Sequence, residues 1–201
     1  MKQRALFLIL AIASLFLLPS TASSQSEKKP PEKSAGMDAT DLSVPLKDGA
    51  VEFTAAKTWK RKKPRSKIIA HEFSITPARG DEKPGRITVM AAMGSVDANI
   101  ERWKKQFVPA EGKSIEDVAK IAKTSTDGNE FHIVDIAGTY LDQPSGPFGP
   151  KVKQAGYRML AAIVNVKDEG QFFLKFYGPK KTVDAEEKAF RSFVNSLKIE
   201  D

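Results

Sequence analysis

The chain contains no cysteine. This absence excludes disulfide bonds, thiol redox chemistry, zinc sites built on cysteine and a lipid anchor on a signal-peptide cysteine. A folded domain in this chain must therefore be held together by its apolar core alone. The length of 201 residues is enough for one domain with a core of ordinary size.

Histidine is almost as scarce, because only His71 and His132 are present. Neither lies at a spacing that is typical of a metal site. His71 lies in the apolar row of a predicted strand, so we expect a hydrogen-bonded structural role for it, and His132 is expected near a strand start and partly exposed. No hydrolase elbow or dinucleotide loop occurs, and segment 80–86 lacks the Lys-Ser/Thr ending of a phosphate loop. We therefore expect no catalytic residue, no metal and no cofactor.

The first residues predict an export signal. Met1–Arg4 is charged, Ala5–Leu18 is almost wholly apolar, and small, turn-forming residues follow. The apolar run is shorter than the about twenty residues of a membrane span, so a cleaved leader is favoured over a permanent anchor. We expect residues 1–24 to be a signal peptide, cut after Ala22 or Ser24, and the mature protein to be periplasmic or extracellular.

Residues 25–43 are rich in lysine, proline and serine and have few apolar residues. Such a segment cannot bury enough apolar surface to offset its ordering entropy, so we expect a flexible linker before a single domain at 44–201. The formal net charge of the whole chain is +7. This excess is too small for a nucleic-acid-binding protein, although it slightly favours acidic partners or anionic surfaces.

The stretch Gln171–Leu197 predicts the centre of the fold. Gln171–Gly178 is expected to be an interior strand, followed by a Gly-Pro break and a helix from about Thr182 to Leu197, with Thr182 or Asp184 as its N-cap. One strand face carries Phe172, Leu174 and Phe176, and the other carries Phe173, Lys175 and Tyr177. The helix repeats Val183, Phe190, Val194 and Leu197 at helical spacing. We expect this helix to cover the strand.

Apolar periodicity also indicates the remaining elements. Strands are predicted over 67–75, 86–93, 131–141 and 157–166, and a helix from Ser95 or Asp97 to about Phe107. Trp103 lies in the apolar stripe of this helix, so we expect it in the core, and we expect Trp59 to plug a core edge. Segment 115–125 fits either a short helical turn or a strand that enters the Asp127-Gly128 turn, and we favour the strand.

Two segments are candidate binding surfaces. Positive charge is most concentrated over Lys57–Lys67, which we interpret as a solvated loop or as a binding patch. Asp142–Lys151 is the longest irregular stretch in the domain, and its prolines and glycines exclude regular structure. Asp142 lies where calcium would bind weakly, but this stretch supplies too few oxygen ligands. The candidate binding residues are Lys60, Arg61, Lys62, Arg65, Asp142 and Phe148.

The order of elements resembles the PsbP-like superfamily, the fold of photosystem extrinsic subunits and a nuclear GTPase-release factor. The resemblance covers about 44–199 and depends on the topology, on the helix with Asn99–Trp103 and Gln106-Phe107, and on the closing strand and helix that end in Phe190, Phe193 and Leu197. It implies an α+β fold, an α/β/α sandwich with an antiparallel sheet of about six to seven strands and helices on its faces. It also implies a binding or assembly role without catalysis.

Three functions are compatible with these observations. The first is an exported, non-enzymatic binding or assembly-support protein of the periplasm or cell envelope, whose partner is a protein or an anionic envelope component. The second is a small-ligand or lipid carrier with a pocket between the sheet and the Val96–Phe107 helix, lined by Trp103. The third, weaker hypothesis is a hydrolase.

Overall fold

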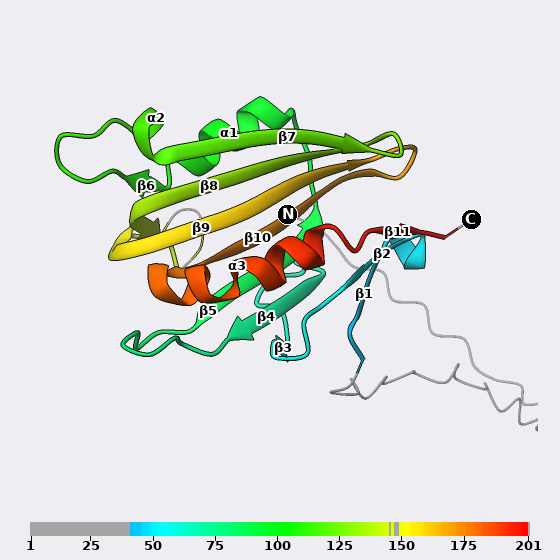
Figure 1. Ribbon diagram of the computed structural model, residues 1–201, viewed down its shortest axis with the longest axis horizontal. Coiled ribbons are helices and arrows are strands. Elements are labelled where there is room, and N and C mark those ends of the chain that lie inside the picture. Colours follow the sequence, from blue (N-terminus) through cyan, green and yellow to red (C-terminus); the bar gives the residue numbers. More distant parts are fainter. Residues whose placement is uncertain (1–40, 145, 147–148, 201) are drawn as a thin grey trace, which may run out of the picture. The chain divides into compact units, whose positions relative to one another are not determined.

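The computed structural model describes residues 41–144, 146 and 149–200 (Figure 1). The predicted signal peptide, most of the predicted linker and Phe148 lie outside these residues. None of the helices in the described part of the chain combines the length and the apolar character that a membrane crossing requires.

The main sheet is antiparallel and has the strand order β3-β4-β5-β10-β9-β8-β6, with β7 also paired to β8. Its strands are β3 (Lys60–Lys62), β4 (His71–Ile75), β5 (Gly85–Ala91), β6 (Phe107–Val108), β7 (Ala119–Thr126), β8 (Asn129–Asp142), β9 (Val152–Val166) and β10 (Gly170–Pro179). The predicted α+β class is confirmed. The sheet has eight strands, one more than the upper end of the prediction, because β6 and β7 pair with successive parts of the long β8.

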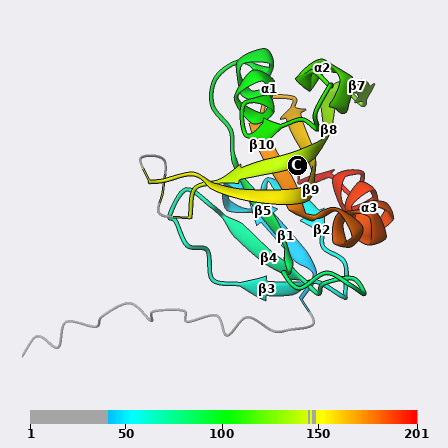
Figure 2. The ribbon, with the colours of Figure 1, turned by 90° about the vertical axis from the view of Figure 1, so that its left-hand side faces the viewer.

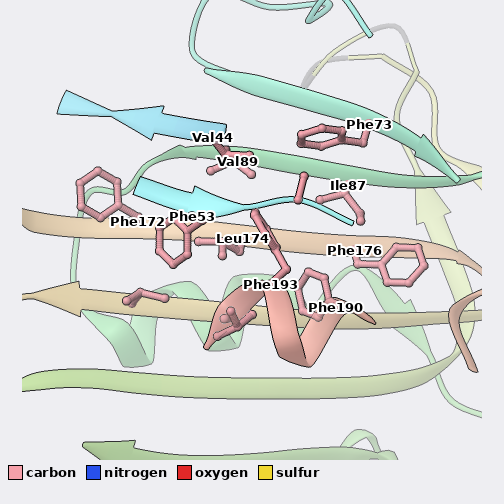
Figure 3. Close-up of a cluster of buried hydrophobic side chains, with 14 of the residues drawn as sticks. Val44, Phe53, Phe73, Ile87, Val89, Phe172, Leu174, Phe176, Phe190 and Phe193 are labelled. Carbon is pink, nitrogen blue, oxygen red and sulfur yellow. The ribbon is translucent and has the colours of Figure 1, made fainter. Parts of the chain in front are cut away.

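The strand β10 has the interior position that its aromatic residues predicted, between β5 and β9. Its residues Phe172, Leu174 and Phe176 belong to one buried core with Phe190 and Phe193 of α3 (Lys180–Val194), as Figure 3 shows. The ring centroids of Phe176 and Phe190 lie 5.7 Å apart. Burying each such side chain stabilises the fold by about 1.5–3 kcal/mol, so this contact fixes α3 on the sheet.

A small second sheet completes this core. It consists of β1 (Ser43–Leu46), β2 (Val51–Thr54) and β11 (Lys198–Ile199), with a 3-10 turn at Lys47–Gly49 between the first two. Trp59 lies beside it and is 7% exposed, as expected for a residue that plugs a core edge. Its ring packs 5.2 Å from Phe193, and its Nε1 donates a hydrogen bond of 3.0 Å to the Glu186 carboxylate.

The opposite face of the sheet is covered by α1 (Val96–Lys104), as Figure 2 shows. The predicted cap is confirmed, because the Ser95 side chain accepts a hydrogen bond from the Ala98 amide. Trp103 is 2% exposed, and its ring packs edge-on against Phe173 with centroids 5.1 Å apart. The helix ends before the predicted Phe107, because Phe107 already pairs with β8 as part of β6.

Segment 115–125 combines both structures that its sequence allowed. Ile115–Val118 forms the short helix α2, which has a capping box between Ser114 and Asp117. The favoured strand follows at once as β7 and turns at Asp127 and Gly128 into β8. The apolar spacing at Ile115 and Val118 therefore forms a single helical turn, and the residues after it form a strand.

Two predictions about the chain before β4 were wrong in detail. Lys60–Lys62, which we interpreted as part of a loop, is the edge strand β3 and pairs with β4. The strand predicted from residue 67 begins at His71, because the backbone turns at Ser66, whose carbonyl accepts a hydrogen bond from the Ile69 amide. The loop proper is therefore 63–70.

The start of α3 also differs from the prediction. Thr182 is fully buried, and neither Thr182 nor Asp184 caps the helix. The Asp81 carboxylate, in the loop between β4 and β5, accepts hydrogen bonds from the Thr182 amide at 2.9 Å and from the Thr182 hydroxyl at 2.7 Å. The cap therefore comes from a residue that is distant in sequence, and helix-start patterns do not include such residues.

Candidate functional site

A groove opens at one end of the main sheet, on the face that also carries α1. Its volume is about 990 Å³. Its lining comes from the loop 63–70 after β3, from the start of β5, from the end of β8 and the residues after it, and from parts of β3, β4, β9 and β10. The lining includes Lys62, Lys63, Arg65, Ser66, Ile69, Glu72, Lys83, Pro84, Arg86, Asp142, Gln143, Gln154, Tyr157 and Tyr177.

The strands β5 and β10 approach closely at this end of the sheet. Gly178 faces Gly85, and a Cβ atom at Gly178 would lie 2.8 Å from the Gly85 Cα. A Cβ atom at Gly85 would in turn lie 2.8 Å from the ring of Phe176. These two glycines are therefore required for the backbone packing that brings β5 and β10 together beneath the groove.

The floor of the groove is a hydrogen-bonded set of charged and phenolic groups. Arg86 makes a bidentate ion pair with Glu72, with distances of 2.9 Å from Nε to Oε1 and 2.8 Å from Nη2 to Oε2. Its Nη1 donates to the Tyr177 hydroxyl oxygen at 2.6 Å. Burial alone would raise the pKa of Glu72, but the hydrogen bonds from Arg86 outweigh it and lower this pKa. The two charges on the floor therefore cancel each other.

The positive charge of the groove lies on one wall. The side chains of Lys62, Lys63 and Arg65 are exposed and make no ion pair or hydrogen bond within the part of the chain that the structure describes. Lys83 on the rim is engaged, because its Nζ donates to Gln154 Oε1 at 2.8 Å. Asp142 stands on the other side. The groove thus has one cationic wall, a neutralised floor and a single carboxylate opposite.

A second unusual group lies next to the floor. Lys175, on the same face of β10 as Tyr177, donates from Nζ to Gln106 Oε1 at 2.6 Å and lies 5.5 Å and 5.1 Å from the ring centroids of Tyr140 and Tyr177. Burial is the main cause that lowers the pKa of Lys175 to about 7, and the nearby Arg102 adds to this effect. Its ammonium group therefore loses its proton close to neutral pH.

The structure brings together three of the predicted binding residues. Lys62, Arg65 and Asp142 line the same groove, although they are distant in the sequence. Lys60 is exposed on β3 and is not part of the lining. Phe148 lies outside the described residues.

Arg61 does not project into the groove. Its Nη1 contacts His71 Nδ1 at 3.0 Å, its Nη2 donates to the Ser43 carbonyl at 2.6 Å, and its guanidinium lies 4.9 Å from the centroid of the Phe73 ring. Arg61 therefore joins β3 to β1 and β4, which gives it a structural role, and its predicted part in binding stays a prediction. The structural role predicted for His71 is confirmed by its contact with the Pro45 carbonyl at 2.6 Å.

The sequence did not predict Tyr177 of the floor, or Lys175 next to it, as site residues. The signal was present, since Lys175 is the one charged residue of the apolar strand Gln171–Gly178. Its partners Gln106 and Tyr140 come from other elements, and no local pattern links them to it.

Two further site hypotheses can be compared with the geometry. Among residues 41–144, 146 and 149–200, no group of three or more His, Cys, Asp or Glu side chains is arranged to hold a metal ion. The carrier hypothesis placed a pocket between α1 and the sheet, lined by Trp103. That side chain instead fills the space against Phe173 and is 2% exposed.

Comparisons with known proteins concern the fold. No family model matches the chain, and no curated protein matches it. The chain is similar to the solution structure of cyanobacterial PsbP (CyanoP) from Synechocystis sp. PCC 6803, with 10% identity, 79% of this chain and 91% of that chain covered, and a TM-score of 0.48. It is also similar to the Ran-binding protein Mog1p of Saccharomyces cerevisiae, with 11% identity, 78% and 94% coverage, and a TM-score of 0.40. Both likenesses concern the fold alone.

Proposed function

We propose that the protein is an exported, non-enzymatic binding protein that holds an anionic partner in the groove. The observation that carries this proposal is the wall of Lys62, Lys63 and Arg65, whose side chains form no ion pair or hydrogen bond within the described residues. Cations on one wall of a concave site attract and orient an anionic partner, and their effect falls as salt is added. Export is proposed from the leader sequence at residues 1–24.

The chemistry of the floor supports binding without turnover. A general acid or base needs a free titratable group within reach of a bound molecule. Glu72 is fully engaged by Arg86, and Tyr177 accepts from the same guanidinium. Lys175 is enclosed by Tyr140 and Tyr177 and bonded to Gln106. Glu72, Tyr177 and Lys175 are thus each engaged by other groups of the protein, which supports a binding role.

The test is neutralisation of the cationic wall. The triple variant Lys62→Gln, Lys63→Gln and Arg65→Gln is compared with wild type for binding a fluorescein-labelled polyglutamate peptide, by fluorescence anisotropy at low salt. Exposed ion pairs contribute about 0.2–1 kcal/mol each, so we expect the affinity to fall about tenfold. Arg61 is left unchanged, because its guanidinium holds β1 and β4.

The matched control is a triple variant with the same net charge, namely Lys105→Gln, Lys113→Gln and Lys188→Gln. These lysines are exposed, and they lie outside the groove lining. We expect the control to bind like wild type and both variants to keep the wild-type melting temperature. Equal loss of affinity in the two triple variants would mean that overall charge, and not the groove, attracts the peptide.

A further inference from the structure

The loop 63–70 presents an exposed aliphatic side chain at the edge of the groove. Ile68 is 73% exposed. The turn beneath it is hydrogen-bonded, because the Ser66 carbonyl accepts from the Ile69 amide at 3.1 Å and the Ser66 hydroxyl accepts from the Ile68 amide at 3.4 Å. The side chain is thus held out into solvent by an ordered backbone.

Cations and apolar groups alternate around this tip. Lys63, Arg65 and Lys67 are exposed on the same loop and form no ion pair within the described part of the chain. Ile69, the neighbour of Ile68, lines the groove together with Tyr157 and Tyr177. The loop tip thus combines the exposed Ile68 and the groove-lining Ile69 with neighbouring cations.

The apolar and basic side chains of the loop 63–70 together indicate which kind of partner would bind there. A partner that covers Ile68 gains free energy, because apolar surface is stabilised by removal from water, and the cations beside it favour a partner with negative charge. Resting on the proposed function, we propose that the partner is a protein that enters the groove with an acidic amphipathic segment. The apolar face of this segment covers Ile68 and Ile69, and its carboxylates face Lys63, Arg65 and Lys67.

A protein segment fits this surface better than an anionic membrane does. Membrane binding by an interfacial segment grows with the apolar area that it inserts, and Ile68 is the one exposed large apolar side chain that the loop 63–70 offers. The cationic wall also belongs to a groove that Asp142 lines, and the carboxylate of Asp142 repels anionic headgroups.

The experiment uses the full mature chain and two labelled synthetic peptides with equal numbers of glutamates. One peptide places leucines along one helical face, and the other has serines at those positions. We expect wild type to bind the leucine peptide at least about tenfold more tightly, and Ile68→Ser to lose that preference, because a buried aliphatic side chain contributes about this factor. Ile68→Met, which keeps the apolar area, should retain the preference.

Met93→Ser is the matched control, because Met93 is 88% exposed and lies outside the groove lining. It should leave the preference unchanged. Equal binding of the two peptides by wild type, or an unchanged preference in Ile68→Ser, would overturn the inference. The proposed function would not be decided by that result, because the triple variant of Lys62, Lys63 and Arg65 tests it separately. Binding to phosphatidylglycerol vesicles that depends on Ile68, with no binding to the leucine peptide, would overturn it in favour of a membrane partner.

Discussion

Arg61 Nη1 and His71 Nδ1 lie 3.0 Å apart, across the neighbouring strands β3 and β4. A guanidinium has no acceptor and is always charged, so His71 Nδ1 must accept this hydrogen bond. The ring proton is therefore on Nε2, which donates to the Pro45 carbonyl of β1 at 2.6 Å. One neutral imidazole thus connects the small sheet to the edge of the main sheet.

This arrangement predicts that acid weakens the fold through His71. Burial, with Arg61 adding to it, lowers the pKa of His71 below its ordinary value of 6.5. The unfolded chain then takes up the proton first, so the contribution of His71 is complete above pH 6.5 and is lost as the pH falls toward the folded pKa. Urea unfolding between about pH 7.5 and about pH 5 should show this loss in wild type. His71→Gln should reduce the slope of the unfolding free energy against pH. An unchanged slope in this variant would contradict the role assigned to His71.

A second prediction concerns the cap of α3. Asp81→Ala removes the carboxylate that accepts from the Thr182 amide and hydroxyl. Loss of a helix cap costs about 1–2 kcal/mol, and we expect a decrease of that size in the free energy of unfolding from urea titration. Glu82→Ala is the control, because Glu82 is exposed and is the next residue in the same loop. Equal effects of the two substitutions would refute the role of Asp81.

A third prediction concerns Lys175 in alkaline solution. The folded protein releases the proton of Lys175 near pH 7, because burial lowers its pKa from 10.5. The unfolded chain keeps that proton up to its own higher pKa, so the Lys175 contribution to stability rises with pH between these two values. Lys175→Met should remove this rise, which is measured as the difference in unfolding free energy between the two proteins at a series of pH values. A constant difference would show that the amine stays charged in the fold.

A fourth prediction concerns Arg158, which joins β9 to β8 and α3. Its guanidinium binds Asp135 through Nε and Nη2, and its Nη1 lies 2.8 Å from Asp184 and 2.7 Å from Glu187. Arg158→Met leaves three carboxylates without their shared cation. We expect a loss of about 2 kcal/mol or more in unfolding free energy, less than the about 3–5 kcal/mol of a fully buried pair because the carboxylates are partly exposed. The unfolding free energy of Arg158→Lys should lie between those of wild type and Arg158→Met.

Local sequence patterns predicted most of the core. The strand around Phe172–Phe176 and the helix around Phe190 each show their own period, and each buries the face that the period indicated. The edge strand β3 was missed because three consecutive basic residues show no alternation of apolar and polar side chains. In the small second sheet, the sequence predicts a short strand at Val51–Phe53, which β2 confirms. Its other strands, β1 and β11, were missed because they are too short for a period to emerge.

The site was less predictable, because it depends on which side chains meet after folding. Charge and loop length indicated Lys62, Arg65 and Asp142 as binding residues, and the three line one groove. The same criteria marked Arg61, whose hydrogen bonds to His71 and Ser43 are long-range contacts that no local pattern reveals. Tyr177 and Arg86 were predicted only as strand residues, since their contact depends on the register between β5 and β10.

The loop between β4 and β5 contributes both to the start of α3 and to the groove. Asp81 holds the first turn of α3, and Lys83 with Pro84 forms the rim of the groove. The anchoring of α3 and the shape of the groove rim therefore depend on the same short stretch of backbone, so a substitution in this loop is expected to affect both.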